Sequence, residues 1–257
     1  MNTRLKTKEE IAIMREGGAR HAQILAELAA LVKPGVSTFT LEEEALAMIK
    51  AMGDKPAFLD YQPAGADRPF PASLCVSIND EIVHGIPNEV ERLLQEGDLV
   101  SLDLGLIHKG LITDSAITVP CGAVDDEARE LLRIGKLALE RGVEAAKNGN
   151  TIGDIGFAIS EVVKGTGFSL AKDLAGHGVG HRVHEEPYVP NEGKSGKGMK
   201  LVPGMVIAIE PMVNVGSGEI KTLSDGYTIV TKDGKRSVHF EHTVAITEEG
   251  NMVLTRG

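Results

Sequence analysis

Apolar residues at the start of the chain follow a helical period. They recur at three- and four-residue spacing over Ile11–Leu31, which predicts one long amphipathic helix. Thr7 and Glu10 form a capping box before this run, and Lys33–Gly35 ends it. A second capping box at Thr40–Glu43 predicts another, shorter helix.

Strand-like patterns follow a proline-rich segment. Asp60–Pro71 holds three of the 11 prolines and is predicted to be a loop. Strands are then predicted at residues 74–78, 99–107 and 111–119, the last two joined by a turn at 108–110. The second half repeats this order, with helices predicted at 125–147 and 152–164 and strands near 205–209, 227–231, 238–246 and 252–254.

The two halves correspond at an offset of about 114 residues, with Gly35 matched by Gly149. This repeat predicts an α+β fold in which residues 1–257 form one domain. The domain consists of two related halves, roughly 7–120 and 121–254, with a cleft between them. A coincidence of helical periodicity is the alternative explanation.

Composition narrows the class of protein. The chain has 257 residues, 42% of them apolar, which is enough for a buried core. A formal net charge of −10 and only 4% aromatic residues are atypical of a nucleic-acid-binding protein. Two cysteines, no run of 18 apolar residues and no apolar signal core at the start predict a globular cytoplasmic protein without a membrane span.

Acidic residues stand out in the predicted strands, where aspartate is rare. Asp103 and Asp114 lie in opposite arms of a hairpin, and a His108-Lys109 turn would place them face to face. Facing carboxylates repel each other, and a bridging cation would reverse that penalty. A three-residue turn that includes Gly110 would shift the register by one residue, and two unrelated edge-strand aspartates are a further alternative.

Two glutamates and a histidine-rich segment add to this pattern. Glu210 and Glu241 each interrupt an apolar strand-like run, and a core salt bridge is the ordinary explanation for such a residue. Few lysines or arginines lie nearby in the sequence to act as partners. His177, His181 and His184 share a glycine-rich segment, and its glycines argue against a helical zinc pair of His177 and His181.

Together these residues form a donor set for divalent ions. The set is four carboxylates, Asp103, Asp114, Glu210 and Glu241, with one imidazole from the histidine-rich segment. Such hard donors fit two ions such as Mn²⁺, Fe²⁺, Co²⁺ or Zn²⁺, and four negative charges balance two dications. An ion pair of this kind can lower the pKa of a bridging water and polarise a carbonyl during hydrolysis.

Five motifs occur in a fixed order along the chain. They are Val83-His84-Gly85-Ile86-Pro87, the Asp103 and Asp114 pair, His177–Pro187, Ile209-Glu210-Pro211-Met212 and Phe240-Glu241-His242-Thr243. As an ordered set they resemble the type I methionine aminopeptidases, over nearly the whole chain. The resemblance implies a pita-bread fold, with two pseudo-symmetric halves, a central antiparallel sheet and outer helices. It also implies removal of the initiator methionine from nascent proteins and peptides when the second residue is small.

The resemblance assigns metal ligands and a proton carrier. In the family pattern the ligands of two divalent ions (Co, Mn, Fe, Zn or Ni) are Asp103, Asp114, His177, Glu210 and Glu241. Asp114 and Glu241 would bridge the ions, and a water or hydroxide between the ions would attack the peptide carbonyl. Glu210 is also the implied group for proton transfer.

Two further histidines receive roles from the resemblance. His84 would contact the substrate amine or the tetrahedral centre, and His184 would bind the scissile carbonyl oxygen. The structural alternatives are a turn residue for His84 and a pairing with Glu185 or Glu186 for His184.

The same pattern implies a methionine pocket with apolar, polarizable walls. Its implied lining is Cys75, Tyr227 and an aromatic residue of the proline-rich loop, Tyr61 or Phe70, for each of which a core or loop-anchoring role is the alternative. Two departures bear on its shape. Val183 stands where the family commonly has Phe, and the Asp60–Pro71 loop is longer than in the short bacterial enzymes.

Other functions remain to be weighed. Xaa-Pro aminopeptidases and prolidases share the fold but carry a large N-terminal domain, for which the residues before the first helix leave no room. A non-catalytic binding module or a creatinase-like enzyme would lack the metal ligands, and all five are present here. The absence of a Cys/His-rich extension resembles the bacterial form, and the short span between Glu210 and Glu241 argues against type II.

The expected partners are the N termini of peptides and nascent chains, bound by a monomer without a nucleic-acid or membrane partner. Lysines 194, 197 and 200 lie in a Gly- and Ser-rich segment. We interpret this segment as a solvated loop, with a transient ribosome contact as the alternative.

Overall fold

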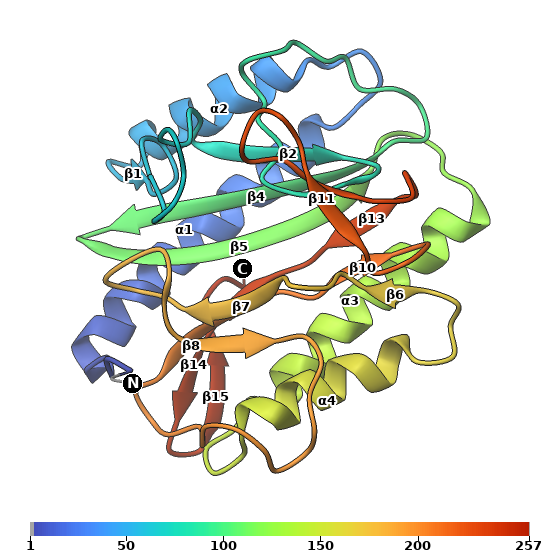
Figure 1. Cartoon of the computed structure of the whole chain (residues 1–257). Helices are drawn as coiled ribbons and strands as arrows, with labels where there is room; N and C mark the ends of the chain where they lie inside the picture. Colours follow the sequence, from blue (N-terminus) through green and yellow to red (C-terminus); the bar gives the residue numbers. More distant parts are fainter. Residues whose placement is uncertain (1–2, 257) are drawn as a thin grey trace.

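The helices occur in two pairs that repeat along the chain (Figure 1). The computed structural model describes residues 3–256. Within this range the helices are α1 (Lys8–Leu31), α2 (Thr38–Ala51), α3 (Asp126–Ala145) and α4 (Ile152–Val163). α2 and α4 begin at Thr38 and Ile152, 114 residues apart, as the repeat predicts. Gly35 and Gly149, shortly before these helices, have matching φ angles of 87° and 88°.

The named strands pair antiparallel in four sheets. In the first sheet, β4 pairs with β5 along one edge and with β1 and β2 along the other; the strands are β1 (Lys55–Pro56), β2 (Leu74–Ile78), β4 (Leu99–His108) and β5 (Leu111–Pro120). A five-stranded sheet has the order β15 (Gly250–Val253), β14 (His242–Thr247), β9 (Val206–Ile209), β7 (Ala175–Gly178) and β8 (Glu185–Pro190). Two three-stranded sheets have the orders β13 (Ser237–His239), β10 (Met212–Asn214), β6 (Ser169–Leu170) and β11 (Ile220–Thr222), β12 (Ile229–Thr231), β3 (Glu81–Val83).

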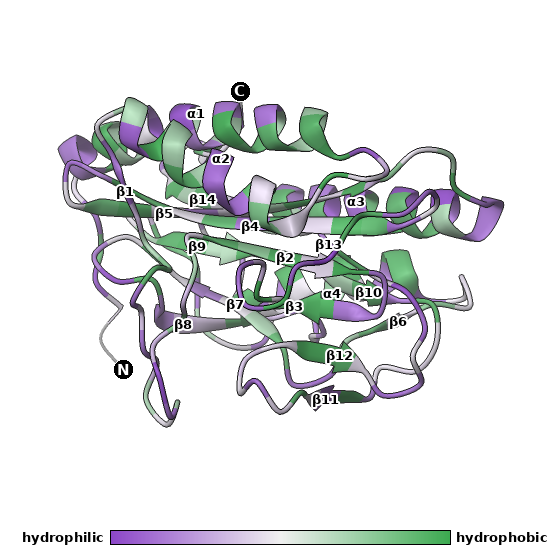
Figure 2. Cartoon of the chain, turned by 90° about the horizontal axis from the view of Figure 1, so that it is seen from above, coloured by the Kyte–Doolittle hydropathy of each residue, from purple (hydrophilic) through white to green (hydrophobic). Residues whose placement is uncertain are grey.

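Helices α1, α2 and α3 lie along one face of the sheets, and the opposite face carries the loops and short strands (Figure 2). One buried cluster packs α1 and α2 against the first sheet and includes Leu28 and Leu102. A second cluster packs α3 and α4 against the five-stranded sheet and includes Ile159 and Ile207. No helix within residues 3–256 is long and apolar enough to cross a membrane.

Helix caps follow the sequence with one exception. Thr7 with Glu10 caps α1 as predicted, and Asp125 and Thr151 with Asp154 cap α3 and α4. The cap predicted for α2 was wrong, because that helix begins earlier and its N-cap is Ser37, whose hydroxyl accepts from the amide of Phe39. Thr40 therefore lies inside the helix. Glu42, in the same helix, is buried and accepts hydrogen bonds from the backbone of Ser73 and Leu74.

The β4–β5 hairpin departs from the predicted register. Its two-residue turn is Lys109–Gly110, and both residues have positive φ, as tight hairpin turns require. Asp103 pairs with Ala116 and Gly105 with Asp114, so the prediction that the two aspartates face each other was wrong. The observed register differs from the predicted one by two residues, and not by the one residue that a three-residue turn would give. Both carboxylates therefore stay on one face of the sheet, one diagonal step apart, without a bulge.

Candidate active site

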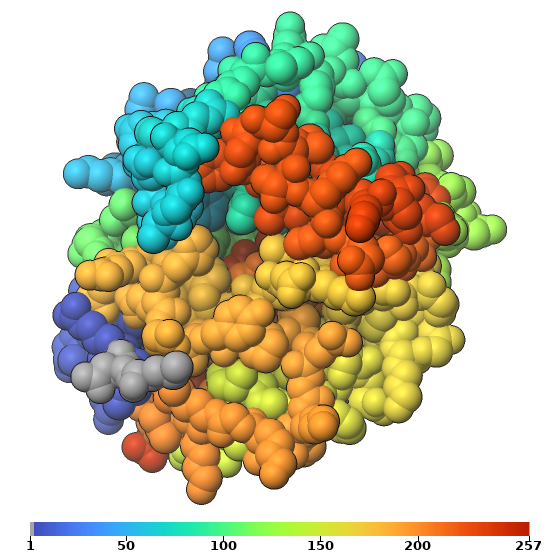
Figure 3. Space-filling model, in the orientation of Figure 1, coloured from blue at the N-terminus to red at the C-terminus, as the bar shows by residue number. Residues whose placement is uncertain are grey.

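A cleft opens on the face away from α1 and α2. Figure 3 shows the surface hollowed where the segment around residues 175–190 meets the segments around 60–75 and 215–235. Two adjoining cavities of about 720 and 310 Å³ occupy it. His84, His177, His184 and Glu210 line both cavities, so these side chains mark the place where the two spaces join.

The five candidate metal ligands converge at this junction. One ligand atom each from Asp114, His177 and Glu241 lies within 4.8 Å of the others. His177 Nε2 is also 3.4 Å from Glu210 Oε1 and 3.9 Å from Asp114 Oδ2. Asp103 lies on the same sheet face as Asp114 and lines the smaller cavity with Glu241. The side chains come from β4, β5, β7, the end of β9 and the link between β13 and β14.

No lysine or arginine within the described residues pairs with these carboxylates. Within residues 3–256 their only ion-pair partners are histidines. Oδ1 of Asp103 and Oδ1 of Asp114 are buried without a hydrogen-bond partner among these residues. Burial raises the pKa of Asp103 to about 7 and raises the pKa of Asp114 and of Glu241 well above the usual range. Such a cluster fits divalent cations, which would satisfy both the charge and the orphaned oxygens.

His177 is held in the tautomer that a metal ligand needs. Its Nδ1 lies 2.9 Å from the carbonyl oxygen of Gly178, so Nδ1–H donates there and the Nε2 lone pair faces the carboxylates. The flanking glycines allow this placement. A Cβ at Gly176 would lie 2.2 Å from Ala208 O, and one at Gly178 would lie 2.2 Å from Glu186 O. β7 can therefore lie close between its two neighbouring strands, β8 and β9.

The predicted strand over 238–246 is in fact two strands, because the chain leaves one sheet and enters another at Phe240–Glu241. This break places Glu241 beside β5. The amide of Glu241 donates to Ala116 O at 2.9 Å. The Thr243 hydroxyl accepts from the amide of Asp114 and donates to its carbonyl, at 2.8 and 2.7 Å. These bonds fix the two candidate bridging carboxylates relative to each other.

Glu210 differs from the other carboxylates of the site in the direction of its pKa shift. Burial raises its pKa, but the imidazoles of His239 and His177 beside it outweigh burial and lower the pKa below its usual value. His239 was not among the residues predicted from the sequence. Its Nε2 lies 3.6 Å from Glu210 Oε2 and 4.0 Å from Glu241 Oε2. The sequence did contain a signal for His239. It precedes Glu241 by two residues in the strand predicted over 238–246, and alternate positions of a strand share a face.

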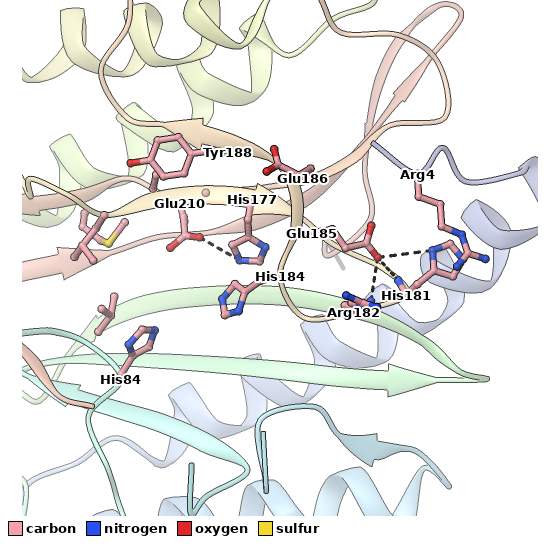
Figure 4. Close-up of a pocket in the computed structure, with 15 residues that line it drawn as sticks. Arg4, His84, His177, His181, Arg182, His184, Glu185, Glu186, Tyr188 and Glu210 are labelled. Carbon is pink, nitrogen blue, oxygen red and sulfur yellow. Dashed lines mark hydrogen bonds and ion pairs between the residues drawn. The ribbon is translucent and has the colours of Figure 1, made fainter. Parts of the chain in front are cut away.

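His84 follows β3 in a left-handed conformation, with φ of 60°. The next residue must be glycine, because a Cβ at Gly85 would lie 2.3 Å from Val76 O. This backbone directs the His84 ring into the cleft, across from His177 and His184 (Figure 4). Burial lowers the pKa of His84 to about 4, so the imidazole is neutral near pH 7.

His184 is held by a tyrosine of the long loop. Its Nδ1 lies 2.8 Å from the hydroxyl of Tyr61, and its ring centroid lies 4.4 Å from that of His177. The alternative pairing with a neighbouring glutamate is wrong for Glu185, which binds Lys6 at 2.5 Å. Desolvation in the cleft lowers the pKa of His184 to about 4.

His181 does not belong to the metal cluster. It lies on a loop, and its Nε2 is 2.7 Å from Glu10 Oε1. Figure 4 shows it on the far side of Glu185 from His177, which agrees with the argument against a helical zinc pair.

The smaller cavity has apolar walls. Its walls include all four candidate pocket residues and Val183: Tyr61, Phe70, Cys75, Tyr227 and Val183. Phe58 and Ile229 also line it, and the sequence analysis missed both. Phe58 fits because β4 carries Gly105 opposite it, where a Cβ would lie 2.6 Å from the Phe58 ring.

Similarity to known proteins covers almost the whole chain. The profile of metallopeptidase family M24 matches residues 12–248. The chain is 47% identical over 257 residues to methionine aminopeptidase of Aquifex aeolicus (strain VF5), with 99% of each chain covered. It is 45% identical over 251 residues to methionine aminopeptidase 1 of Bacillus subtilis (strain 168), with 98% of each covered. Among solved structures, methionine aminopeptidase from Thermotoga maritima matches with a TM-score of 0.94 and 39% identity over 100% of both chains.

Proposed function

This chain belongs to metallopeptidase family M24, and we propose that it acts as a methionine aminopeptidase, removing the initiator methionine when the second residue is small. One observation carries the proposal. Ligand-type side chains that pair with no lysine or arginine in the described part of the chain meet at the junction of an open cleft and an apolar cavity. A hydrolytic centre beside a pocket for one apolar side chain is what an exopeptidase of this specificity requires.

Metal use follows from family membership, and the donor set supports a site for two ions. The proposed ligands of these divalent ions (Co, Mn, Fe, Zn or Ni) are Asp103, Asp114, His177, Glu210 and Glu241. Asp114 and Glu241 are the proposed shared ligands, as the family resemblance implies, and burial raises the pKa of both carboxyls well above the usual range, so that each would gain from bound cations. When bound, the ions supply Lewis acidity and lower the pKa of a water.

The N-terminal methionine of the substrate occupies the apolar cavity. An unbranched thioether side chain fits a cavity of about 310 Å³ that is lined by aromatic and sulfur-containing residues. Tyr61, Phe70, Cys75 and Tyr227 are its proposed contacts. The rest of the peptide leaves through the larger, open part of the cleft.

Three side chains carry the proton and charge movements. Glu210, whose pKa is kept low, takes a proton from the attacking water and delivers it to the leaving amine. His184 donates from Nε2 to the scissile carbonyl oxygen, where negative charge develops. His84, across the cleft, contacts the substrate amine or the tetrahedral centre.

A peptide panel tests this function. Protein loaded with Mn²⁺ or Co²⁺ is incubated with Met-Gly-Met-Met, with the same peptide carrying Lys at the second position, and with an Xaa-Pro peptide. We expect free methionine from the first peptide, far less from the second and no cleavage of the third. Cleavage of the Xaa-Pro peptide without release of methionine from Met-Gly-Met-Met would overturn the proposal.

A further inference from the structure

The long loop between β1 and β2 forms a wall of the apolar cavity. Pro63 and Ala66 line the cavity together with Tyr61 and Phe70 at the two ends of the loop. The ends are tied to each other, because the amide of Phe70 donates to Tyr61 O at 2.8 Å. Between these ends, only one side chain makes charged contacts with the rest of the molecule, and it is Arg68.

Arg68 joins the loop to two other segments. Its guanidinium binds both carboxylate oxygens of Glu89, with Nη2 at 2.9 Å from Oε2. The same Nη2 donates to the carbonyl oxygen of Asp225 at 3.1 Å. The carbonyl oxygen of Arg68 accepts a hydrogen bond from the hydroxyl of Tyr227. A planar guanidinium with several donors suits the contacts with Glu89 and Asp225, which a lysine could not reproduce. The bond from Tyr227, in contrast, goes to the backbone carbonyl of Arg68.

These contacts fix two aromatic walls of the cavity together. The Asp225 carboxylate accepts from the amides of Tyr227 and Thr228, each at 2.9 Å, and so shapes the turn that carries Tyr227. The Tyr227 ring stands edge-on to Phe70, with 5.2 Å between the ring centroids. Movement of Arg68 would therefore release both rings.

We propose that Arg68 is a specificity-determining positioning residue. It holds the loop as a fixed wall, so that the cavity accepts an unbranched side chain and excludes bulkier N-terminal residues. The loop wall matters more here than it would beside a phenylalanine at position 183, because the small side chain of Val183 lines the same cavity. This inference rests on the proposed function.

The contacts of Arg68 are suited to shaping a surface rather than to stabilising the fold. The side chains of Arg68 and Glu89 are both 39% exposed. Exposed ion pairs contribute little to the free energy of unfolding. Loss of Arg68 should therefore loosen the wall while the fold persists, which makes the inference testable.

The test compares Arg68→Ala with Arg133→Ala. Arg133 makes a similar two-point contact with Glu130 on the surface of α3, so it controls for loss of an exposed arginine–glutamate pair. The kcat/KM values are measured on peptides that begin with Met, Leu or Phe. We expect the Met-to-Phe preference to fall roughly tenfold in Arg68→Ala, with KM for the Met peptide raised and kcat nearly unchanged, as for loss of uniform binding. Arg133→Ala should match the wild type.

A second readout does not depend on metal or activity. Hydrogen exchange of the Phe70 and Thr228 amides should be faster in metal-free Arg68→Ala than in the wild type or Arg133→Ala. Arg68→Lys should give an intermediate preference, because it keeps the charge and loses the two-point contact. An unchanged preference and unchanged exchange in Arg68→Ala would overturn the inference while wild-type release of methionine left the proposed function intact. A wild type that releases no methionine would instead overturn the proposed function.

Discussion

The hydroxyl of Tyr61 shows how one side chain can set the chemistry of another. Burial raises the pKa of Tyr61, so its hydroxyl is protonated and can donate. Donation to Nδ1 of His184 places the imidazole proton on Nε2, the only nitrogen left to donate to a substrate carbonyl oxygen. The opposite arrangement would leave Nε2 unable to donate.

We therefore expect Tyr61→Phe to lower kcat roughly tenfold, because the imidazole is no longer held in the donating tautomer. KM for Met-Gly-Met-Met should change little, since the phenyl ring still lines the cavity. Steady-state kinetics measure both values. Tyr188→Phe is the matched control, because Tyr188 lines the same cleft and is 59% exposed. An unchanged kcat in Tyr61→Phe would contradict the assigned donor direction.

At the same scale, sequence reasoning recognised residue types better than it recognised local geometry. The sequence marked four carboxylates as candidates for a functional site, because carboxylates in apolar strands need partners. They are Asp103, Asp114, Glu210 and Glu241. The four side chains converge in the structure, which agrees with a shared site. Their roles as metal ligands stay a prediction. His239 was missed although it precedes Glu241 by two residues, the spacing that would put both side chains on one face of the strand predicted there.

Among the elements, the N-terminal turn of α4 is hydrogen-bonded to the loop that contains Ser195 and Gly196. Oδ2 of Asp154 accepts from the backbone amide and hydroxyl of Thr151, each at 2.8 Å. Oδ1 accepts from the Ser195 hydroxyl at 2.6 Å and from the amide of Gly196 at 2.9 Å. The hydrogen bonds from Ser195, Thr151 and Gly196 lower the pKa of Asp154. One carboxylate thus caps a helix and anchors a loop.

Asp154→Asn should reduce the free energy of unfolding by about 1 kcal/mol at pH 7, the usual effect of a lost cap. The lowered pKa makes the wild-type contribution complete above the unfolded-state pKa of about 4, and it is lost as the pH falls further. Urea unfolding from pH 8 to pH 3 should show a constant difference that shrinks below about pH 4. Glu161→Gln, on an exposed pair of the same helix, should change little at any pH. A difference that grows on acidification would contradict this account.

For the whole molecule, the site exists only because distant strands meet. Asp114 belongs to β5 and Glu241 follows β13, and the Thr243 hydroxyl connects the two segments. The predicted α+β pita-bread fold is confirmed by helix pairs that repeat at the same offset and by the match to the Thermotoga maritima structure. The division into halves at 7–120 and 121–254 stays a prediction.

Metal should stabilise the whole fold, because four of its five proposed ligands are largely buried carboxylates that pair with no lysine or arginine within residues 3–256. Adding Mn²⁺ or Co²⁺ at about 100 times its Kd should add about 2.7 kcal/mol to the free energy of unfolding, and a chelator should remove the gain. Calorimetry of the metal-free and metal-loaded protein measures this as a shift in Tm.

The same measurement on Asp114→Asn should show no gain from metal and no peptide turnover, with the protein still folded. Asp126→Asn is the control, since the Asp126 side chain is 98% exposed. Full metal stabilisation and turnover in Asp114→Asn would exclude the bridging role proposed for Asp114.

The sequence by itself determined the helices, most strand positions and the chemical kinds of residue at the site. Periodicity and caps are local properties, and carboxylates in apolar runs are visible without coordinates. The tertiary structure alone decided the hairpin register, the break at Phe240–Glu241 and the bond from Tyr61 to His184. It also decided the hydrogen bonds from the Arg68 guanidinium to Glu89 and Asp225. These depend on turn conformation and on contacts between residues far apart in the chain, which local patterns do not specify.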